Sequence, residues 1–315
     1  MSDAVSRVRV ILNPAAGLVP GERTAQVAAA FARHPGVRVD IEELTRPADL
    51  NRAIARALAF GADVIAVGGG DGTLSMAADL LAETPAVLGV LPLGSLNHFA
   101  RDLRLPLELD EAVDVIVGGR TARVDLGEVN GRYFINNTSI GVYPMAVRLR
   151  DRWRHYLGKW PAMLLANLTL LLFLPLLKVR VSLEPGRRSG AVVVVFVGNN
   201  RYQLHWPALG QRLRLDSGML DLMVLREANP WYIMRAIWLV SRGRVKEVRG
   251  LETGLRGELV VNSRRRHLRI GIDGETLLMD CPLHYRIRPA ALRVRVDPAH
   301  WPVERGGAPT AHAGY

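Results

Sequence analysis

The stretch Asp63-Val64-Ile65-Ala66-Val67-Gly68-Gly69-Gly70-Asp71-Gly72-Thr73-Leu74 decides the first part of the fold. Residues 63–67 are predicted to form a buried strand, the glycine-rich run ends it, and residues 74–81 are predicted to form a helix. N–H groups at a helix N-terminus favour anions, and glycines let a phosphate approach the backbone closely. No Gly-Lys-Ser/Thr follows and Thr73 replaces a third glycine, which excludes a Walker A loop and a G-x-G-x-x-G fingerprint. A strained turn with Asp71 capping the helix is the alternative.

Strands alternate with helices over the first 125 residues. Strands are predicted at 8–12, 37–44, 63–67 and 87–91, and helices at 22–34, 47–60 and 74–81. Such alternation with short loops predicts a parallel sheet covered on both faces. After about residue 123, short strands separated by turns, among them 133–138 and 220–225, predict an antiparallel sheet or sandwich. Helices are predicted at about 160–175 and at 230–242, the second with Asn229 as its cap. The length of 315 residues therefore favours two domains, an α/β domain followed by an antiparallel one.

The composition limits the classes of function. The chain is 49% hydrophobic and 23% charged, so it is globular, and its one cysteine excludes an internal disulfide or a Cys-rich metal site. The net charge of +11 favours polyanions: nucleic acid, nucleotides or an anionic membrane. An arginine-rich codon usage explains the charge equally well, because only three of the 41 basic residues are lysines. The aromatic content of 6% argues against nucleic acid, and the strand-like start without a signal peptide predicts a cytoplasmic protein.

Residues 160–177 form an uncharged stretch that is long enough to be a candidate membrane span. Asn167, Thr169, Pro161 and Pro175 weaken that candidate. A span here would also separate the glycine loops from a later acidic motif that is expected to share their site. A buried or lipid-facing helix is therefore preferred.

Three further motifs follow the same chemistry. Asn13-Pro14-Ala15-Ala16-Gly17 and Gly94-Ser95-Leu96-Asn97 each follow a strand, at the carboxyl edge where ligands bind in such sheets. Ile272-Asp273-Gly274-Glu275 places two carboxylates on a turn, which a simple hairpin explains about as well. A carboxylate such as Asp71 among phosphate-binding amides is explained by Mg²⁺, which would screen it from the phosphates.

In this order, the four motifs resemble the diacylglycerol kinase catalytic-domain family, which also includes sphingosine and ceramide kinases. The resemblance extends from residue 8 to about 297 and implies a fold like that of the NAD and diacylglycerol kinases. It implies an α/β nucleotide-binding domain at 1–128, joined by 288–300, and a β-sandwich lipid-substrate domain at 129–287. ATP and Mg²⁺ would bind in the cleft between them, and the Gly-, Ala- and Pro-rich tail at 303–315 is expected to be disordered.

The resemblance also implies roles for single residues. Glu275 corresponds to the general base, and Asp71 lies near the catalytic magnesium. The implied nucleotide-binding residues are Asn13, Thr45, Gly69, Gly70, Asp71, Gly72, Thr73, Ser95 and Asn97. The implied metal positions are Asp71, Asp125 in a metal–water network, and Asp216 with the carbonyls of Leu213 and Gly218 at a second, structural magnesium.

One position departs from the family pattern. His98 stands where the family usually has an aspartate, and an imidazole cannot act as a magnesium-linked carboxylate. Asp102 or Asp125 would then supply the magnesium-linked carboxylate. His98 would either contact the substrate or only cap a helix. Ser95 in place of threonine is a milder change.

Three functions remain open. An NAD kinase shares the Gly-Gly-Asp-Gly-Thr loop, but the turn at Asn13 and the motif at 272–275 argue against it. A non-catalytic lipid-binding protein would explain His98 but not the pair of Asp71 and Glu275. We expect an ATP- and Mg²⁺-dependent kinase of a neutral lipid alcohol, with diacylglycerol as the leading substrate.

Such a kinase would have to reach a lipid substrate. The basic surface and residues 160–177 are expected to dock peripherally on the anionic inner face of a membrane. Trp231, Tyr232 and Trp238 are candidate interfacial aromatics, although core packing of the 230–242 helix is preferred. A homodimer is allowed, and no sequence feature fixes the oligomeric state.

Overall fold

The computed structural model of the chain describes residues 5–13, 21–141, 179–182, 192, 194–204, 210–226 and 229–301. The chain forms two compact units. Of the described residues, the first unit contains those up to Leu126 and those from Arg288 to Trp301, and the second contains those from Gly127 to Ile287. Two strands, β5 (Arg120–Val129) and β15 (Leu283–Val296), begin in one unit and end in the other.

The first unit is built on a parallel sheet with the strand order β2-β1-β3-β4-β15. Its first four strands are β1 (Arg7–Leu12), β2 (Arg38–Glu43), β3 (Val64–Gly69) and β4 (Val87–Pro92). The register sets Val8 of β1 opposite Val64 of β3, and Val64 opposite Val87 of β4. Every residue of β3 is buried, as expected of a parallel strand covered on both faces. The predicted α/β class is confirmed for this unit.

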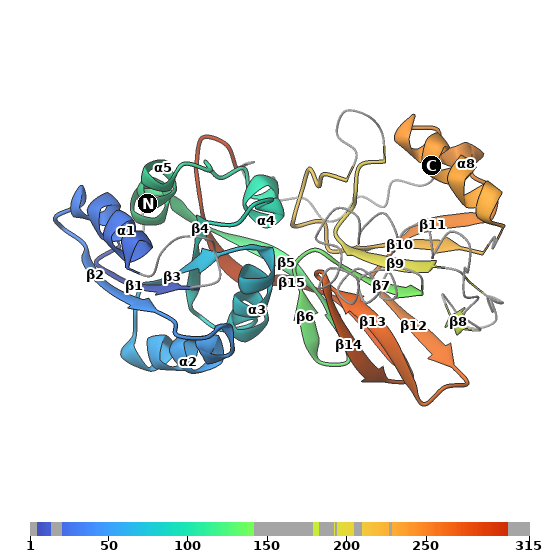
Figure 1. Cartoon of the computed structure of the whole chain (residues 1–315), viewed down its shortest axis with the longest axis horizontal. Coiled ribbons are helices and arrows are strands. Elements are labelled where there is room, and N and C mark those ends of the chain that lie inside the picture. Colours follow the sequence, from blue (N-terminus) through green and yellow to red (C-terminus); the bar gives the residue numbers. More distant parts are fainter. Residues whose placement is uncertain are drawn as a thin grey trace, which may run out of the picture. The chain divides into compact units, whose positions relative to one another are not determined.

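Helices cover both faces of this sheet. They are α1 (Glu22–Ala32), α2 (Leu50–Phe60) after a short 3-10 turn at Pro47–Asp49, α3 (Asp71–Leu81), α4 (His98–Asp102) and α5 (Leu109–Gly118). Figure 1 shows α1 and α5 on one face of the sheet and α2 and α3 on the other. Phe31 of α1 and Ile116 of α5 join one buried cluster with Val10 of β1. Because the helices pack on the two faces of the sheet, the carboxyl ends of the strands and the loops that follow them are the part of this unit where a site can form.

The second unit contains an antiparallel sheet with the strand order β11-β10-β9-β7-β13-β14. Its strands are β7 (Asn137–Gly141), β9 (Val194–Asn199), β10 (Leu220–Leu225), β11 (Leu251–Arg256), β13 (His267–Ile272) and β14 (Glu275–Asp280). In a second layer, β12 (Glu258–Ser263) pairs with β8 (Val179–Ser182) and with the start of β15, and β6 (Arg132–Phe134) pairs with β5. Val197 and Ile270 from the first layer share one buried cluster with Val261 and Tyr285 from the second. The predicted antiparallel second half is confirmed.

The helix α8 (Pro230–Ser241) precedes a 3-10 turn at Val245–Glu247. The side chain of Asn229 accepts a hydrogen bond from the Trp231 N–H at 3.0 Å, so the predicted cap is confirmed. Among the described residues, no helix is long and apolar enough to cross a membrane. The uncharged stretch 160–177 and the tail 303–315 lie outside those residues.

Candidate functional site

The glycine-rich loop passes into helix earlier than the sequence predicts. α3 begins at Asp71 rather than at residue 74, because Gly70 is extended (φ −85°, ψ 179°) and takes the N-cap position. The first-turn N–H groups therefore belong to Asp71, Gly72 and Thr73. A glycine at the cap has no side chain that could accept these groups, so they are available to an anion.

The first strand ends beside this loop. The Asn13 side-chain amide donates a hydrogen bond to the Thr73 hydroxyl at 2.6 Å, and the Asn13 backbone N–H donates to the Gly68 carbonyl at 2.9 Å. The first of these contacts joins residues 60 positions apart in the chain. Both contacts follow from the parallel pairing of β1 with β3, which brings both carboxyl ends to one edge. The rest of the first motif, residues 14–17, lies outside the described part of the chain.

The loop after β4 packs directly against the glycine-rich loop. A Cβ atom added to Gly94 would lie 2.6 Å from the Gly70 Cα and 2.9 Å from the Asn97 Oδ1. A Cβ added to Gly69 would lie 2.7 Å from the Thr73 Cβ. Glycine is therefore required at position 94 so that the two loops can touch through their backbones, and at position 69 because the Thr73 side chain fills the space beside it.

Asn97 holds the loop after β4 in its shape. It is buried and adopts a left-handed backbone conformation with φ 52°. Its side-chain oxygen accepts the Gly94 N–H at 2.9 Å, and its side-chain nitrogen donates to the carbonyls of Pro92 and Gly94, both at 3.0 Å. Both polar atoms of this predicted nucleotide-binding side chain thus have partners inside the loop.

Asp71 connects α3 to the short helix α4. Its Oδ1 accepts a hydrogen bond from the Phe99 N–H at 3.2 Å. Next to that contact, the side chains of Ser95 and His98 are exposed, with His98 as the first residue of α4. Thr45 is exposed just beyond the end of β2. The structure therefore gathers most of the predicted nucleotide-binding residues at one edge of the parallel sheet.

Asp125 of β5 is buried in the first unit. Its Oδ1 accepts the Ala290 N–H at 2.9 Å, at a point where Ala290 has φ 54°. This contact holds a left-handed residue within β15 and gives the carboxylate a structural partner that the sequence does not reveal.

Glu275 lies in the second unit, at the start of the edge strand β14. The preceding Asp273 and Gly274 form a two-residue hairpin turn with φ values of 45° and 91°, as the hairpin alternative expects. The Asp273 carboxylate accepts three backbone N–H groups, from Ile135 at 2.8 Å, Asn136 at 2.8 Å and Asn137 at 2.9 Å. The Glu275 side chain is exposed, and the hydrogen bonds of Asp273 hold the turn that precedes it.

A buried arginine supports the same anchored segment. Arg212 is 3% exposed, donates to the side-chain oxygen of Asn136 at 2.8 Å, and lies 5.5 Å from the centre of the Tyr202 ring. Nearby, burial raises the pKa of Asp221 above its ordinary value, although the Tyr202 N–H donates to its carboxylate at 2.9 Å and lowers the pKa. No sequence signal marks Arg212 or Asp273 for these roles, because their partners are distant in the chain.

The predicted second magnesium position lies in the loop before β10. The Asp216 carboxylate is paired with Arg214, with 2.8 Å from Nε to Oδ1 and 3.0 Å from Nη2 to Oδ2. The Leu213 side chain is exposed, and Gly218 has φ 67°. Three strands separate β10 from β14 in the sheet order, so this loop and Glu275 are not neighbours there. The described residues contain no group of three or more His, Cys, Asp or Glu side chains that could hold a metal ion by themselves.

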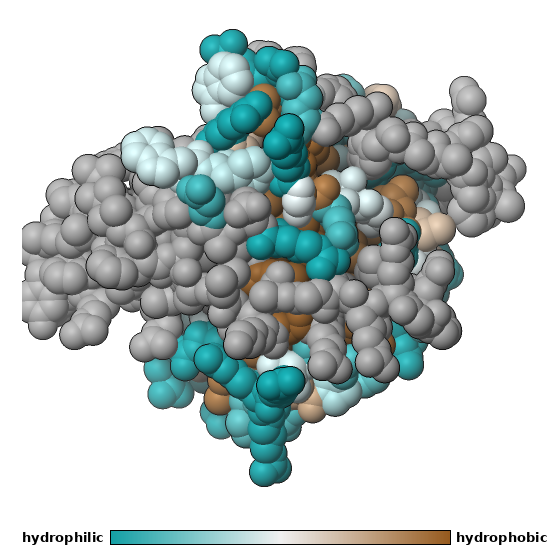
Figure 2. Space-filling view, turned by 90° about the vertical axis from the view of Figure 1, so that its right-hand side faces the viewer, coloured by the Kyte–Doolittle hydropathy of each residue, from teal (hydrophilic) through white to brown (hydrophobic). Residues whose placement is uncertain are grey.

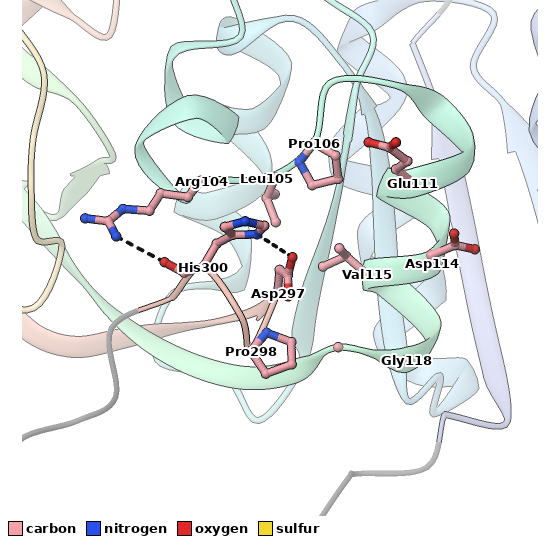
Figure 3. Close-up of a pocket in the computed structure, with 11 residues that line it drawn as sticks. Arg104, Leu105, Pro106, Glu111, Asp114, Val115, Gly118, Asp297, Pro298 and His300 are labelled. Atoms are coloured by element: carbon pink, nitrogen blue, oxygen red, sulfur yellow. Dashed lines mark hydrogen bonds and ion pairs between the residues drawn. The ribbon is translucent and has the colours of Figure 1, made fainter.

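A pocket of about 700 Å³ lies elsewhere in the first unit. Figure 3 shows its lining by α5, the loop after α4 and the chain after β15. The His300 ring is 2.6 Å from the Asp297 carboxylate, and Arg104 donates to the His300 carbonyl at 3.1 Å. The Ala299 N–H and the His300 ring lower the pKa of Asp297. None of the predicted site residues lines this pocket, so we assign the glycine-loop edge as the candidate site.

The chain is similar to known proteins that carry one name. The family model described as diacylglycerol kinase catalytic domain matches residues 7–129. A diacylglycerol kinase of Staphylococcus saprophyticus is 28% identical over 240 residues, covering 75% of this chain and 78% of the relative. A diacylglycerol kinase of Staphylococcus haemolyticus is 29% identical over 238 residues, covering 75% of this chain and 72% of the relative.

A solved structure shares the fold. The crystal structure of a diacylglycerol kinase from Bacillus anthracis aligns with a TM-score of 0.66 at 20% identity, covering 94% of this chain and 98% of that one. Residues 7–129 are therefore similar to the diacylglycerol kinase catalytic-domain family, and the solved structure shares the fold of nearly the whole chain.

Proposed function

We propose that the chain is an ATP- and Mg²⁺-dependent lipid kinase that transfers the γ-phosphate of ATP to the hydroxyl of a neutral lipid, diacylglycerol. The observation that carries the proposal is the N-terminus of α3, which begins at a glycine cap and is joined by two further loops. The names of the similar staphylococcal proteins support the choice of diacylglycerol over other lipid alcohols.

The first unit supplies groups suited to a nucleotide. The first-turn N–H groups of Asp71, Gly72 and Thr73 would bind phosphate oxygens, and the hydrogen bond from Asn13 to Thr73 would fix the loop around them. Thr45 and Ser95, both exposed at the same edge, would contact the rest of the nucleotide.

The donor set fits Mg²⁺ bound together with a nucleotide. Proteins usually hold this ion through one or two carboxylates, with phosphate oxygens and waters completing the shell, and Asp71 is a carboxylate at the phosphate-binding helix end. When bound, Mg²⁺ neutralises charge on the transferring phosphate. Asp125 and the Asp216 loop, with the carbonyls of Leu213 and Gly218, would be outer or structural magnesium positions.

Glu275 would be the proton acceptor. Transfer to an alcohol requires a base that takes the hydroxyl proton, and such a base typically contributes about 10²–10⁴-fold to the rate. Glu275 is accessible to a substrate, and the hydrogen bonds of Asp273 hold the turn that presents it. The proposal requires this carboxylate to act on the same reaction as the glycine loop, and assigns His98 a contact with the lipid.

The test is the transfer of labelled γ-phosphate from Mg·ATP to diacylglycerol, monoacylglycerol, ceramide and a sphingoid base in mixed micelles, and separately to NAD. We expect label on diacylglycerol and a loss of about 10²-fold or more in Glu275→Gln. Glu258→Gln is the matched control, because Glu258 is also an exposed glutamate at the start of a strand in the same unit. Label on NAD alone, or ATP binding without transfer to any lipid, would contradict the proposal.

The proposal includes peripheral contact with an anionic membrane. Diacylglycerol resides in a bilayer, so the enzyme must reach it there. The net charge of +11 provides the long-range attraction to an anionic surface.

A further inference from the structure

The helix α8 carries an outward stripe that the proposed reaction does not use. Trp231, Arg235, Trp238 and Arg242 are spaced by four, three and four residues, which places them on one helical face. All four are exposed, Trp231 to 79% and Trp238 to 47%. In Figure 2 the upper part of the surface, over α8, combines teal hydrophilic residues with pale ones.

The helix is held to the second unit by a neighbouring face. Tyr232, Ala236 and Leu239 pack in one cluster with Val248. Core packing, the preferred expectation for this helix, is therefore correct for Tyr232 and wrong for the two tryptophans. The exposed tryptophans can be replaced without removing this packing.

The stripe is also basic. The Arg242 guanidinium lies 5.0 Å from the centre of the Trp238 ring, which keeps the cation and the ring together. Two nearby arginines are neutralised, Arg226 by Glu252 and Arg244 by Glu247. None of the carboxylates that the structure describes forms an ion pair with Arg235 or Arg242.

We propose that this stripe, Trp231, Arg235, Trp238 and Arg242, is the surface by which the chain docks on an anionic lipid bilayer. The inference rests on the proposed function, because a kinase of a bilayer lipid must bind at the headgroup level. Tryptophan is enriched at that level, and arginine lays its apolar stem there while its guanidinium meets anionic headgroups. A stripe that alternates tryptophan and arginine therefore suits the headgroup level of an anionic bilayer in both polarity and charge.

The test is flotation of the full chain with vesicles of phosphatidylglycerol and phosphatidylcholine, and with vesicles of phosphatidylcholine alone, without ATP. We expect wild type to float with the anionic vesicles. Trp231→Ala/Trp238→Ala should lower the partition coefficient about tenfold, because apolar area is no longer buried at the boundary. Arg235→Gln/Arg242→Gln should lower it about 25-fold at low salt, about fivefold for each arginine.

Two controls separate docking from folding and catalysis. Phe60→Ala removes another exposed aromatic side chain, 56% exposed at the end of α2 in the first unit, and should float as wild type does. The stripe variants should keep the wild-type melting temperature and the wild-type rate on a dispersed short-chain diacylglycerol.

Each outcome decides one proposal. Unchanged flotation of both stripe variants, an equal loss in Phe60→Ala, or absence of wild-type flotation would overturn the docking surface. Flotation that depends on the stripe without phosphate transfer to any lipid would uphold the surface and refute the proposed reaction.

Discussion

The contact between the two glycine loops gives a sharp prediction for Gly94→Ala. The new methyl carbon would lie 2.6 Å from the Gly70 Cα, whereas unstrained carbon contacts lie at about 3.5–4.0 Å. The loops must therefore separate by about 1 Å, which also disturbs the side chain of Asn97. Overpacking of this kind typically costs about 1–3 kcal/mol, and we expect the free energy of unfolding to fall by that amount.

Gly70→Ala is the matched control. Its Cβ would approach only the Gly94 Cα, at 3.8 Å, which is an ordinary contact. The backbone of Gly70, at φ −85° and ψ 179°, is open to alanine. Alanine restricts the unfolded chain but is a poorer N-cap residue than glycine, so the two effects oppose each other and the free energy of unfolding of Gly70→Ala should lie within about 0.5 kcal/mol of the wild-type value.

Guanidinium denaturation of both variants and wild type, followed by circular dichroism, measures the difference. The reasoning predicts a large loss for Gly94→Ala and none for Gly70→Ala. Equal stabilities of the two variants, or a greater loss in Gly70→Ala, would refute the packing of the two loops.

Two further predictions concern the second unit. Asp273→Asn replaces a carboxylate oxygen by an amide donor, so at least one of the three N–H groups, such as that of Ile135, loses its acceptor; the free energy of unfolding should fall by about 2 kcal/mol in urea denaturation. Asp280→Asn, at the exposed end of β14, the strand that follows the turn at Asp273, should change the free energy of unfolding by less than about 1 kcal/mol. Burial raises the pKa of Asp221 in the folded state, so the folded state holds the proton more tightly than the unfolded state does. The free energy of unfolding should therefore fall as the pH rises from about 4 through the folded-state pKa. Asp221→Asn should remove this loss, so the free energy of unfolding of the variant minus that of wild type should increase between pH 4 and pH 7 in a series of denaturation experiments. A difference that stays constant with pH would contradict a buried carboxylate with a raised pKa.

The sequence predicts well those features whose causes are local. The strand at 220–225 matches β10, and the cap at Asn229 is present, because alternation and capping depend on neighbouring residues. The parallel sheet also follows from its pattern of apolar strands and amphipathic helices. The edge that gathers Asn13 with the glycine loop follows from that topology.

Features with distant causes could not be predicted. One strand is expected at 133–138, but the structure divides it into β6 and β7, because Asp273 accepts the N–H groups of residues 135–137 from 136 or more positions away. The early start of α3 depends on the extended conformation of Gly70, which no composition signal reports. The exposure of Trp231 and Trp238 depends on which face of α8 packs on the unit.

The central claim is that the N-terminus of α3 and its glycine cap hold the phosphates of ATP. Isothermal titration of Mg·ATP into wild type and Gly70→Ala tests it most directly, because the added methyl meets only the Gly94 Cα, at 3.8 Å, and is carried by the cap residue that directly precedes the N–H groups of α3. We predict that wild type binds and that the affinity of Gly70→Ala falls about tenfold or more, equivalent to about 1.4 kcal/mol. Equal affinities of the two proteins, with both fully folded, would contradict the claim.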